Sequence, residues 1–166
     1  GPAAYGRGGE EVTLTDANIV LGRLNPAALL AGRMMMDADA ARHAVELKIA
    51  GPLNLSVEEA AIGIIRVAAS GIARAIRSVA SAKGHNPADF SLFAYGGAGP
   101  LLACDVNDEV GCKRILVPRE PGTLCARGIL LSDLTFDFVK TLLCRAEEDG
   151  WQQAKAAFVN LETQAT

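Results

Sequence analysis

The sequence predicts an α/β fold that is rich in helix. Half of the 166 residues are hydrophobic and only 5% are aromatic. The core must therefore be built from alanine and branched aliphatic side chains, as is typical of helix-rich α/β proteins. Short apolar runs alternate with longer amphipathic segments, an order that favours parallel strands joined by right-handed helical crossovers. A chain of this length fits one ordinary domain.

Short helices are expected in the first third of the chain. Thr15 is predicted to cap the first helix, because its hydroxyl can accept a free N–H group of the opening turn. A second helix is expected to start at Asn25-Pro26, and Gly51-Pro52 is expected to end the third. The expected elements are an extended stretch at residues 12–14 and helices at residues 16–23, 25–31 and 37–49.

A capping box gives the strongest local signal. Ser56 stands at the N-cap and Glu59 at the third helical position, so each can satisfy a free N–H group near the other. The pattern predicts a long helix from residue 56 to about residue 83. Apolar residues at three- and four-residue steps predict one buried stripe. Its members are Ile62, Ile65, Ala69, Ile72, Ala73, Ile76 and Val79.

Strands are predicted in the second half of the chain. The apolar run at residues 90–95 leads into the glycine loop Gly96-Gly97-Ala98-Gly99-Pro100, which a helix to about residue 110 follows. Residues 114–117 are expected to form a second, buried strand, which Pro118 ends. Further on, the sequence predicts a helix at residues 122–132, a strand at 135–139 and a terminal helix at 148–165.

Charge and hydropathy exclude several classes of partner. The net charge of −3 arises from 19 acidic and 16 basic residues, which gives no electrostatic reason to expect nucleic acid or an anionic membrane surface. No apolar run approaches the roughly 20 residues of a membrane span, and the opening residues lack the apolar stretch of a secretory signal. We therefore expect a cytoplasmic protein.

The cysteines and histidines form no pattern of a metal or redox site. Cys104, Cys112, Cys125 and Cys144 are irregularly spaced, with no CxxC pair, so reduced and mostly buried thiols are expected. His43 and His85 have no second ligand at a useful spacing, and so few histidines assemble no Ser/His/Asp or Cys/His site.

The glycine loop after residue 95 is the main candidate site. Glycines let a backbone turn sharply and approach a ligand without interference from Cβ atoms. The helix that follows offers free N–H groups and a positive dipole end, which suit a phosphate or a nucleotide. The alternative is a tight strand-to-helix turn without a ligand. The loop is neither a dinucleotide fingerprint, since Leu102 stands where a glycine is required, nor a P-loop, since no GK[ST] follows.

Asp16 and Asn18 form a second candidate site. Both carry hard oxygen atoms that can face a metal or a substrate. The alternative role for Asp16 is structural, because an acidic side chain in the first turn of a helix is stabilised by the helix dipole.

Three stretches read together resemble one family. GPAAYGRGG followed by TLTDANIVLGRL, then YGGAGPLLAC, and then ILVPREPGTLCARGILLSD are similar to the hydantoinase A/5-oxoprolinase/acetone carboxylase family. The resemblance runs from Gly1 to about Asp137, in the same order. It implies a fold similar to that of actin, sugar kinases and heat-shock chaperones, in which two ribonuclease-H-like domains hold ATP.

The resemblance also implies an activity, with ATP and Mg²⁺ as cofactors. Members of the family use ATP to phosphorylate an oxygen of a cyclic amide or of a small carbonyl compound. Gly96, Gly97, Ala98 and Gly99 match the adenosine motif of the actin-like pattern. The family commonly has His at the position of Leu102, and leucine neither binds metal nor transfers protons, so the resemblance assigns no metal ligands here.

The resemblance leads to a prediction for the whole chain. Residues 1–145 would be the C-terminal part of a hydantoinase A-type actin-like domain, and residues 146–166 a terminal helix. The phosphate-binding loops would precede Gly1 in a longer polypeptide, so the isolated chain is expected to lack ATPase activity. Expected partners are a cyclic amide (hydantoin or 5-oxoproline type), the upstream part of the same polypeptide and a hydantoinase B-type subunit or domain.

Two other functions stay open at this point. The chain could belong to an ATP-dependent acetone-type carboxylase subunit, which the sequence does not separate from a hydrolase. It could also be a non-catalytic binding module, whose long helix docks a partner through its arginines and whose glycine loop is only a turn.

Overall fold

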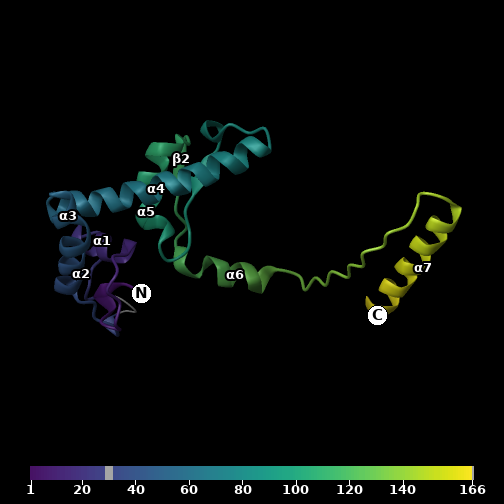
Figure 1. The fold of residues 1–166 in the computed structure, drawn as a ribbon, viewed down its shortest axis with the longest axis horizontal. Helices are drawn as coiled ribbons and strands as arrows, with labels where there is room; N and C mark the ends of the chain where they lie inside the picture. Colours follow the sequence, from purple (N-terminus) through teal and green to yellow (C-terminus); the bar gives the residue numbers. More distant parts are fainter. Residues whose placement is uncertain (29–31, 166) are drawn as a thin grey trace. The chain divides into compact units, whose positions relative to one another are not determined.

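The computed structural model describes residues 1–28 and 32–165. It divides into two compact units, residues 1–125 and 126–166, which can be followed along the chain in Figure 1. The described residues are mostly helical, with a short parallel sheet of two strands. The longer elements are α1 Leu14–Val20, α2 Ala38–Val45, α4 Val57–Ala82, β1 Ser91–Phe93, α5 Gly99–Val110, β2 Arg114–Leu116, α6 Leu124–Leu131 and α7 Glu148–Ala165.

The prediction of a helix-rich α/β fold is confirmed, since the described residues are mostly helical and contain one short parallel sheet. Short turns complete the fold, namely η1 Ala3–Tyr5, η3 Glu46–Ala50, α3 Gly51–Leu53, η4 Pro87–Asp89 and η5 Pro121–Thr123. Within residues 1–28 and 32–165, none of the helices combines the length and the apolar character that a membrane span requires.

The first helix begins two residues earlier than predicted. Thr13, rather than Thr15, is the N-cap of α1, and Asp16 stands at the third helical position. The Asp16 carboxylate accepts hydrogen bonds from the backbone N–H and the hydroxyl of Thr13, at 2.9 and 2.7 Å. This pairing fixes the start of α1, which ends at Val20 rather than at the predicted residue 23. Of the helix predicted at residues 25–31, Asn25 to Ala28 form a turn and the remaining residues lie outside the described ranges.

Gly51-Pro52 does not end the third helix as predicted. After α2 the backbone continues through the wider turn η3 and then through α3, which contains both residues. Pro52 stands in the first turn of α3, where a proline is tolerated because an N–H group would have no helical partner there. The helical course ends at Asn54, whose φ of 53° is left-handed.

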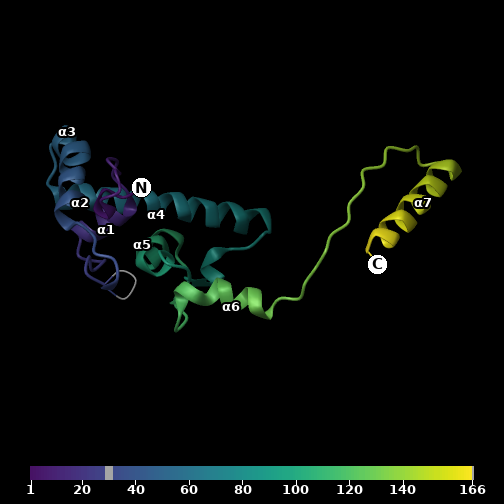
Figure 2. The same cartoon turned by 90° about the horizontal axis from the view of Figure 1, so that it is seen from below.

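The long helix is confirmed, but its apolar stripe is only partly buried. α4 spans Val57–Ala82 behind the predicted Ser56–Glu59 capping box, and it packs against α1, α2 and α5 (Figure 2). Its buried positions are alanines together with Ile65, which is 1% exposed. Ile62, Ile72 and Val79 were predicted to be buried and are 39%, 40% and 61% exposed, because no described element covers that part of the helix.

The two strands confirm parallel pairing. β1 and β2 pair in the register Leu92↔Ile115, and α5 connects them. Leu92 packs against the main core cluster, which α4 and α5 dominate and to which α1 adds Ala17. The second strand was predicted to be buried, but Leu116 is exposed, as is Val117 just beyond it, because no described element covers the opposite face of the sheet.

The second unit holds most of α6 and all of α7. The terminal helix is confirmed, and α6 starts later than predicted because η5 precedes it. Residues 135–139 form no strand, contrary to the prediction. The four cysteines are free as expected, but three of them, Cys104, Cys125 and Cys144, are exposed rather than buried.

Candidate functional site

The glycine loop connects β1 to α5 in a defined conformation. Gly96 has a φ of 85°, which is left-handed and favours glycine. Its N–H group donates to the Pro121 carbonyl at 2.8 Å, and the Ala94 N–H group donates to the Leu116 carbonyl at 2.9 Å. The loop is therefore held to the segment after β2 by its first residue, while the following residues stay available.

Free space surrounds the middle of the loop. An added Cβ at Gly97 would meet no atom within 4 Å, and the same is true at Gly96. Among the described residues, neither the Gly97 nor the Ala98 backbone N–H group has a hydrogen-bond acceptor. Both precede the 12-residue helix α5, so exposed donors lie at its positive dipole end. The arrangement can take a ligand that accepts hydrogen bonds.

An apolar hollow of about 430 Å³ adjoins the loop. Leu14, Ile72, Tyr95 and Ala98 contribute to its lining, and no charged side chain does. Leu102 lines the same hollow and is buried in the main core cluster. Its side chain packs there and supplies no ligand for a metal. Within residues 1–28 and 32–165, no three His, Cys, Asp or Glu side chains gather as a metal site would require.

Asp16 lies at the centre of a buried hydrogen-bond network. The residue is fully buried, and one carboxylate oxygen accepts the Ala4 N–H at 2.9 Å, while the other accepts the two Thr13 donors. Asp16 thus ties η1 to the start of α1. Both oxygens are engaged within the protein, which is the pattern of a structural carboxylate.

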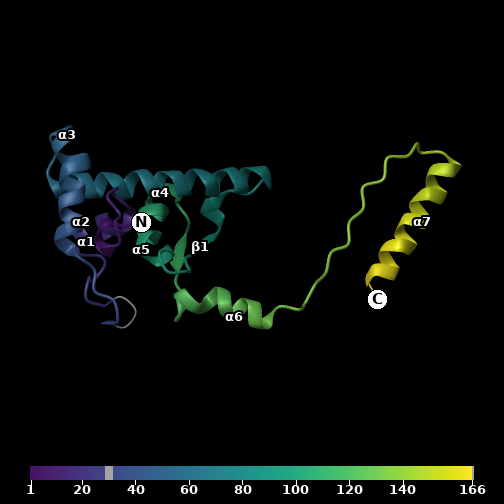
Figure 3. The same cartoon turned by 60° about the horizontal axis from the view of Figure 1, so that its bottom comes forward.

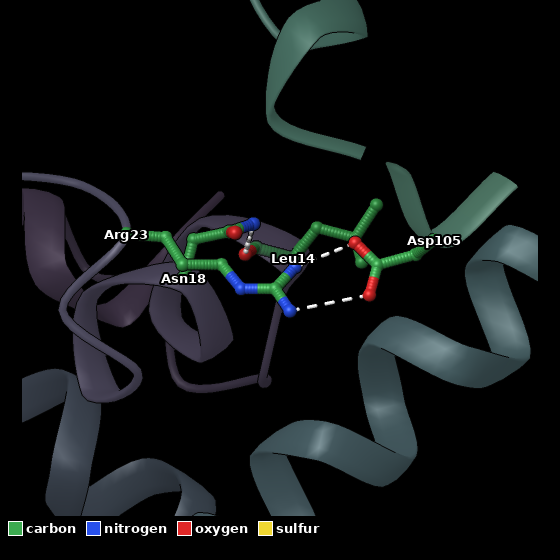
Figure 4. A network of polar contacts seen from close by, with 4 residues as sticks. All are labelled: Leu14, Asn18, Arg23 and Asp105. Atoms are coloured by element: carbon green, nitrogen blue, oxygen red, sulfur yellow. Dashed lines mark hydrogen bonds and ion pairs between the residues drawn. The ribbon is translucent and has the colours of Figure 1, made fainter. Parts of the chain in front are cut away.

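Asn18 and Arg23 make the polar contacts drawn in Figure 4. The Asn18 amide donates to the Leu14 carbonyl at 2.7 Å, and its buried Oδ1 has no partner among the described residues. Arg23 forms a two-pronged ion pair with Asp105 of α5, at 2.6 and 3.1 Å. The hydrogen bond to Asp105 raises the pKa of the Arg23 guanidinium above its ordinary value.

Sequence reasoning missed the Arg23–Asp105 pair, whose members are 82 positions apart. No local pattern marks such a contact. It links the segment after α1 to the helix that begins at the glycine loop. Asp16 and Asn18 make no hydrogen bond to that loop among the described residues. Leu14 connects the two regions, because it accepts from Asn18 and lines the hollow beside Ala98.

A model of the hydantoinase/oxoprolinase family matches residues 1–138. The chain belongs to this family. Caprolactamase subunit alpha from Pseudomonas jessenii is 41% identical over 162 residues, covering 98% of this chain and 22% of that protein.

Two solved structures of the family share this fold. The nucleotide-free structure of acetone carboxylase, reported with its ATP-dependent carboxylation mechanism, matches with a TM-score of 0.75 and 33% identity over 98% of this chain. ATP-dependent caprolactamase from Pseudomonas jessenii matches with a TM-score of 0.73 and 40% identity over 99% of this chain. The family member described here spans 24% of each of those two chains.

Proposed function

We propose that the chain is part of an ATP-dependent hydrolase that opens a cyclic amide, and that it contributes the loop that contacts adenosine. The single observation that carries the proposal is the open glycine loop, with unpaired N–H groups at Gly97 and Ala98 and free space around Gly97. Support for ATP and for a cyclic amide comes from the caprolactamase relative, because that enzyme is described as ATP-dependent and its name denotes a lactam.

The residues present suit one part of a nucleotide. The loop would place its backbone, rather than side chains, against the nucleoside; its residues are Gly96, Gly97, Ala98 and Gly99. The apolar hollow beside the loop suits a flat, uncharged group. When bound with Mg²⁺, ATP supplies the phosphoryl group that activates the amide oxygen. Since no cluster of three potential metal ligands lies within the described residues, the Mg²⁺ ligands would come from the rest of the polypeptide.

Asp16 and Asn18 keep a proposed place near the active site. Asn18 is the better candidate, because its Oδ1 is buried and unpaired and can accept a hydrogen bond from a group outside this chain. Asp16 would hold the start of α1 so that Leu14 and Asn18 keep their positions.

Further parts of the proposal concern the whole protein. Residues 1–145 would belong to an actin-like domain and residues 146–166 to a terminal helix. The longer polypeptide would be a cytoplasmic enzyme that works with a hydantoinase B-type subunit, in keeping with a relative that is itself named a subunit alpha.

A carboxylase is the second candidate. It is favoured by the match to the acetone carboxylase structure. That structure has a TM-score of 0.75, against 0.73 for caprolactamase, although its sequence identity is lower. The two functions differ in the co-substrate, since the hydrolase consumes water and the carboxylase consumes bicarbonate.

The test measures ADP formation by the longer polypeptide, with its second subunit, on a panel of cyclic amides and on acetone with bicarbonate. The hydrolase predicts ADP formation matched by a ring-opened product, without any requirement for bicarbonate. ADP formation that depends on bicarbonate and a ketone would favour the carboxylase. ATP turnover by the isolated 166-residue chain, abolished by Gly97→Val, would contradict the proposed division of the nucleotide site.

A further inference from the structure

A second hollow, of about 360 Å³, lies between α4 and α5. The two helices pack against each other, and Figure 3 shows α5 beneath α4. The hollow shares no lining residue with the apolar hollow beside the glycine loop. Its α5 side consists of Asp105, Asp108 and Glu109, which lie on one stripe because the second and third are three and four residues after the first. Because it also contains two guanidinium groups, it is called the charged hollow below.

The α4 side of the charged hollow provides an apolar floor. The floor consists of Ile62, Ile65 and Ala69. Ile65 and Ala69 are buried, whereas Ile62 is 39% exposed and can still lose apolar surface to a ligand. Arg66 lines the hollow from the same helix. An apolar floor with a few polar groups around it is the usual composition of a small-molecule site.

Most charges of the hollow already have a partner inside the protein. Arg23 and Asp105 form the two-pronged ion pair described above. The Glu109 carboxylate accepts a hydrogen bond from the Ser70 hydroxyl at 3.2 Å, and its backbone carbonyl accepts one from the Arg77 guanidinium. Glu109 therefore has both a hydrogen-bond donor and a cation beside it.

Arg66 and Asp108 are the two charged groups of the hollow that remain without a partner. Within residues 1–28 and 32–165, neither takes part in an ion pair or in a side-chain hydrogen bond, and they do not pair with each other. Two opposite charges that line one hollow without contact suit a ligand with a charge at each end, because each end then gains an ion pair.

We propose that the charged hollow binds a small ω-amino acid in its zwitterionic form. The carboxylate of the ligand pairs with Arg66, whose planar guanidinium matches a carboxylate, and its ammonium group pairs with Asp108. The hydrocarbon stem lies on the apolar floor. A stem of several carbons is needed because the two charges stand on different helices, and the axes of packed helices are roughly 8–10 Å apart.

The ligand class has a connection to the reaction. The opening of a lactam ring yields an amino acid with its two charges at opposite ends, so the charged hollow would bind a product of the enzyme. That connection rests on the proposed function, whereas the binding of a zwitterion rests only on the lining of the hollow.

The first test is a titration of the longer polypeptide with 5-aminopentanoate, followed by NMR of isoleucine δ1-methyl groups without ATP. The Ile62 methyl belongs to the floor of the charged hollow and should shift along a saturable curve. The Ile72 methyl lines the apolar hollow and should not follow that curve. Pentanoate and pentylamine carry one charge each and should bind at least about threefold more weakly. An unmoved Ile62 signal, or equal affinity for the three compounds, would overturn the proposal.

Three variants test the two ion pairs. Arg66→Gln and Asp108→Asn each remove one charge at an exposed position, so the melting temperature should hardly change. Each should weaken the binding of 5-aminopentanoate at least about threefold. Arg74→Gln removes an exposed charge of α4 that does not line the hollow, and it should leave the affinity unchanged. Unchanged affinity in a folded Arg66→Gln or Asp108→Asn protein would contradict the proposal, as would an equal loss in Arg74→Gln. Since no ATP is present, either result is independent of the test by ADP formation.

Discussion

The same substitution, isoleucine to alanine, can be compared at a buried and at a partly exposed position of α4, namely Ile65 and Ile72. Ile65 is 1% exposed within the main core cluster, whereas Ile72 is 40% exposed and lines the apolar hollow beside the glycine loop. Changing either isoleucine to alanine removes three carbons, which is worth about 2.4 kcal/mol at roughly 0.8 kcal/mol per buried carbon. At Ile65 an enclosed cavity adds to this loss, so the free energy of unfolding should fall by about 3–4 kcal/mol.

The loss at Ile72 should be much smaller. Only the buried 60% of the side chain contributes, which reduces the transfer loss to about 1.4 kcal/mol. The site opens to solvent and encloses no cavity, and alanine gains a few tenths of a kcal/mol in helix propensity. We expect Ile72→Ala to cost about 1 kcal/mol in the 166-residue chain.

Urea and thermal unfolding of the two variants check this reasoning. At roughly 2–4 °C per kcal/mol for a chain of this size, Ile65→Ala should lower the melting temperature about three times as far as Ile72→Ala. Equal losses for the two variants in the 166-residue chain would show that Ile72 is already covered, and would refute the burial on which the argument depends.

Three further predictions follow from polar contacts. Asp16→Ala leaves buried donors unpaired and should cost about 3 kcal/mol in urea unfolding; a loss below 1 kcal/mol would contradict the structural role. A double-mutant cycle on Arg23→Gln and Asp105→Asn should give a coupling of about 0.5–1 kcal/mol, since the pair is partly exposed, and zero coupling would disprove the contact. Hydrogen bonds from Ser56 lower the pKa of Glu59, so the stability advantage over Glu59→Gln is complete above the ordinary pKa of 4.5 and disappears as the pH falls through the lowered value. A difference in melting temperature that does not change with pH would contradict this.

Local patterns in the sequence predicted several elements of both units. The Ser56–Glu59 capping box, the strand–glycine–helix order and the terminal helix depend on neighbouring residues, and the structure contains all three. The prediction of Thr15 as the cap was wrong. Thr13 offers the same hydroxyl, and only Thr13 has an acidic residue, Asp16, three positions later to complete a capping box.

Features that depend on distant parts of the chain were not predictable. The Arg23–Asp105 pair joins positions with no shared local pattern. Residues 135–139 have strand-forming side chains, but a strand needs a neighbour, and none of the described residues pairs with them. Helical periodicity predicted that Ile72 faces a core, but the residue is 40% exposed, because burial depends on which distant segments pack against the helix.

The candidate site, too, was predictable from the sequence only in part. The glycine loop was found from the sequence because clustered glycines after an apolar run mark a sharp strand-to-helix turn, and Gly96 adopts a left-handed φ of 85° there. The unpaired Oδ1 of Asn18 and the structural contacts of Asp16 became visible only in three dimensions, since both depend on which donors the fold brings within reach.

The most direct test of the central claim is the ATP affinity of the longer polypeptide carrying Gly97→Val, measured by calorimetry beside the melting temperature without ligand. Gly97 is a suitable position because its φ is not left-handed and an added Cβ meets no atom within 4 Å. Gly63→Val adds the same bulk at an open position on α4 and serves as the control. We expect Gly97→Val to lower ATP affinity at least tenfold, about 1.4 kcal/mol, with both melting temperatures close to that of the parent. Unchanged ATP affinity in a folded Gly97→Val protein would contradict the assignment of the glycine loop to the nucleotide site.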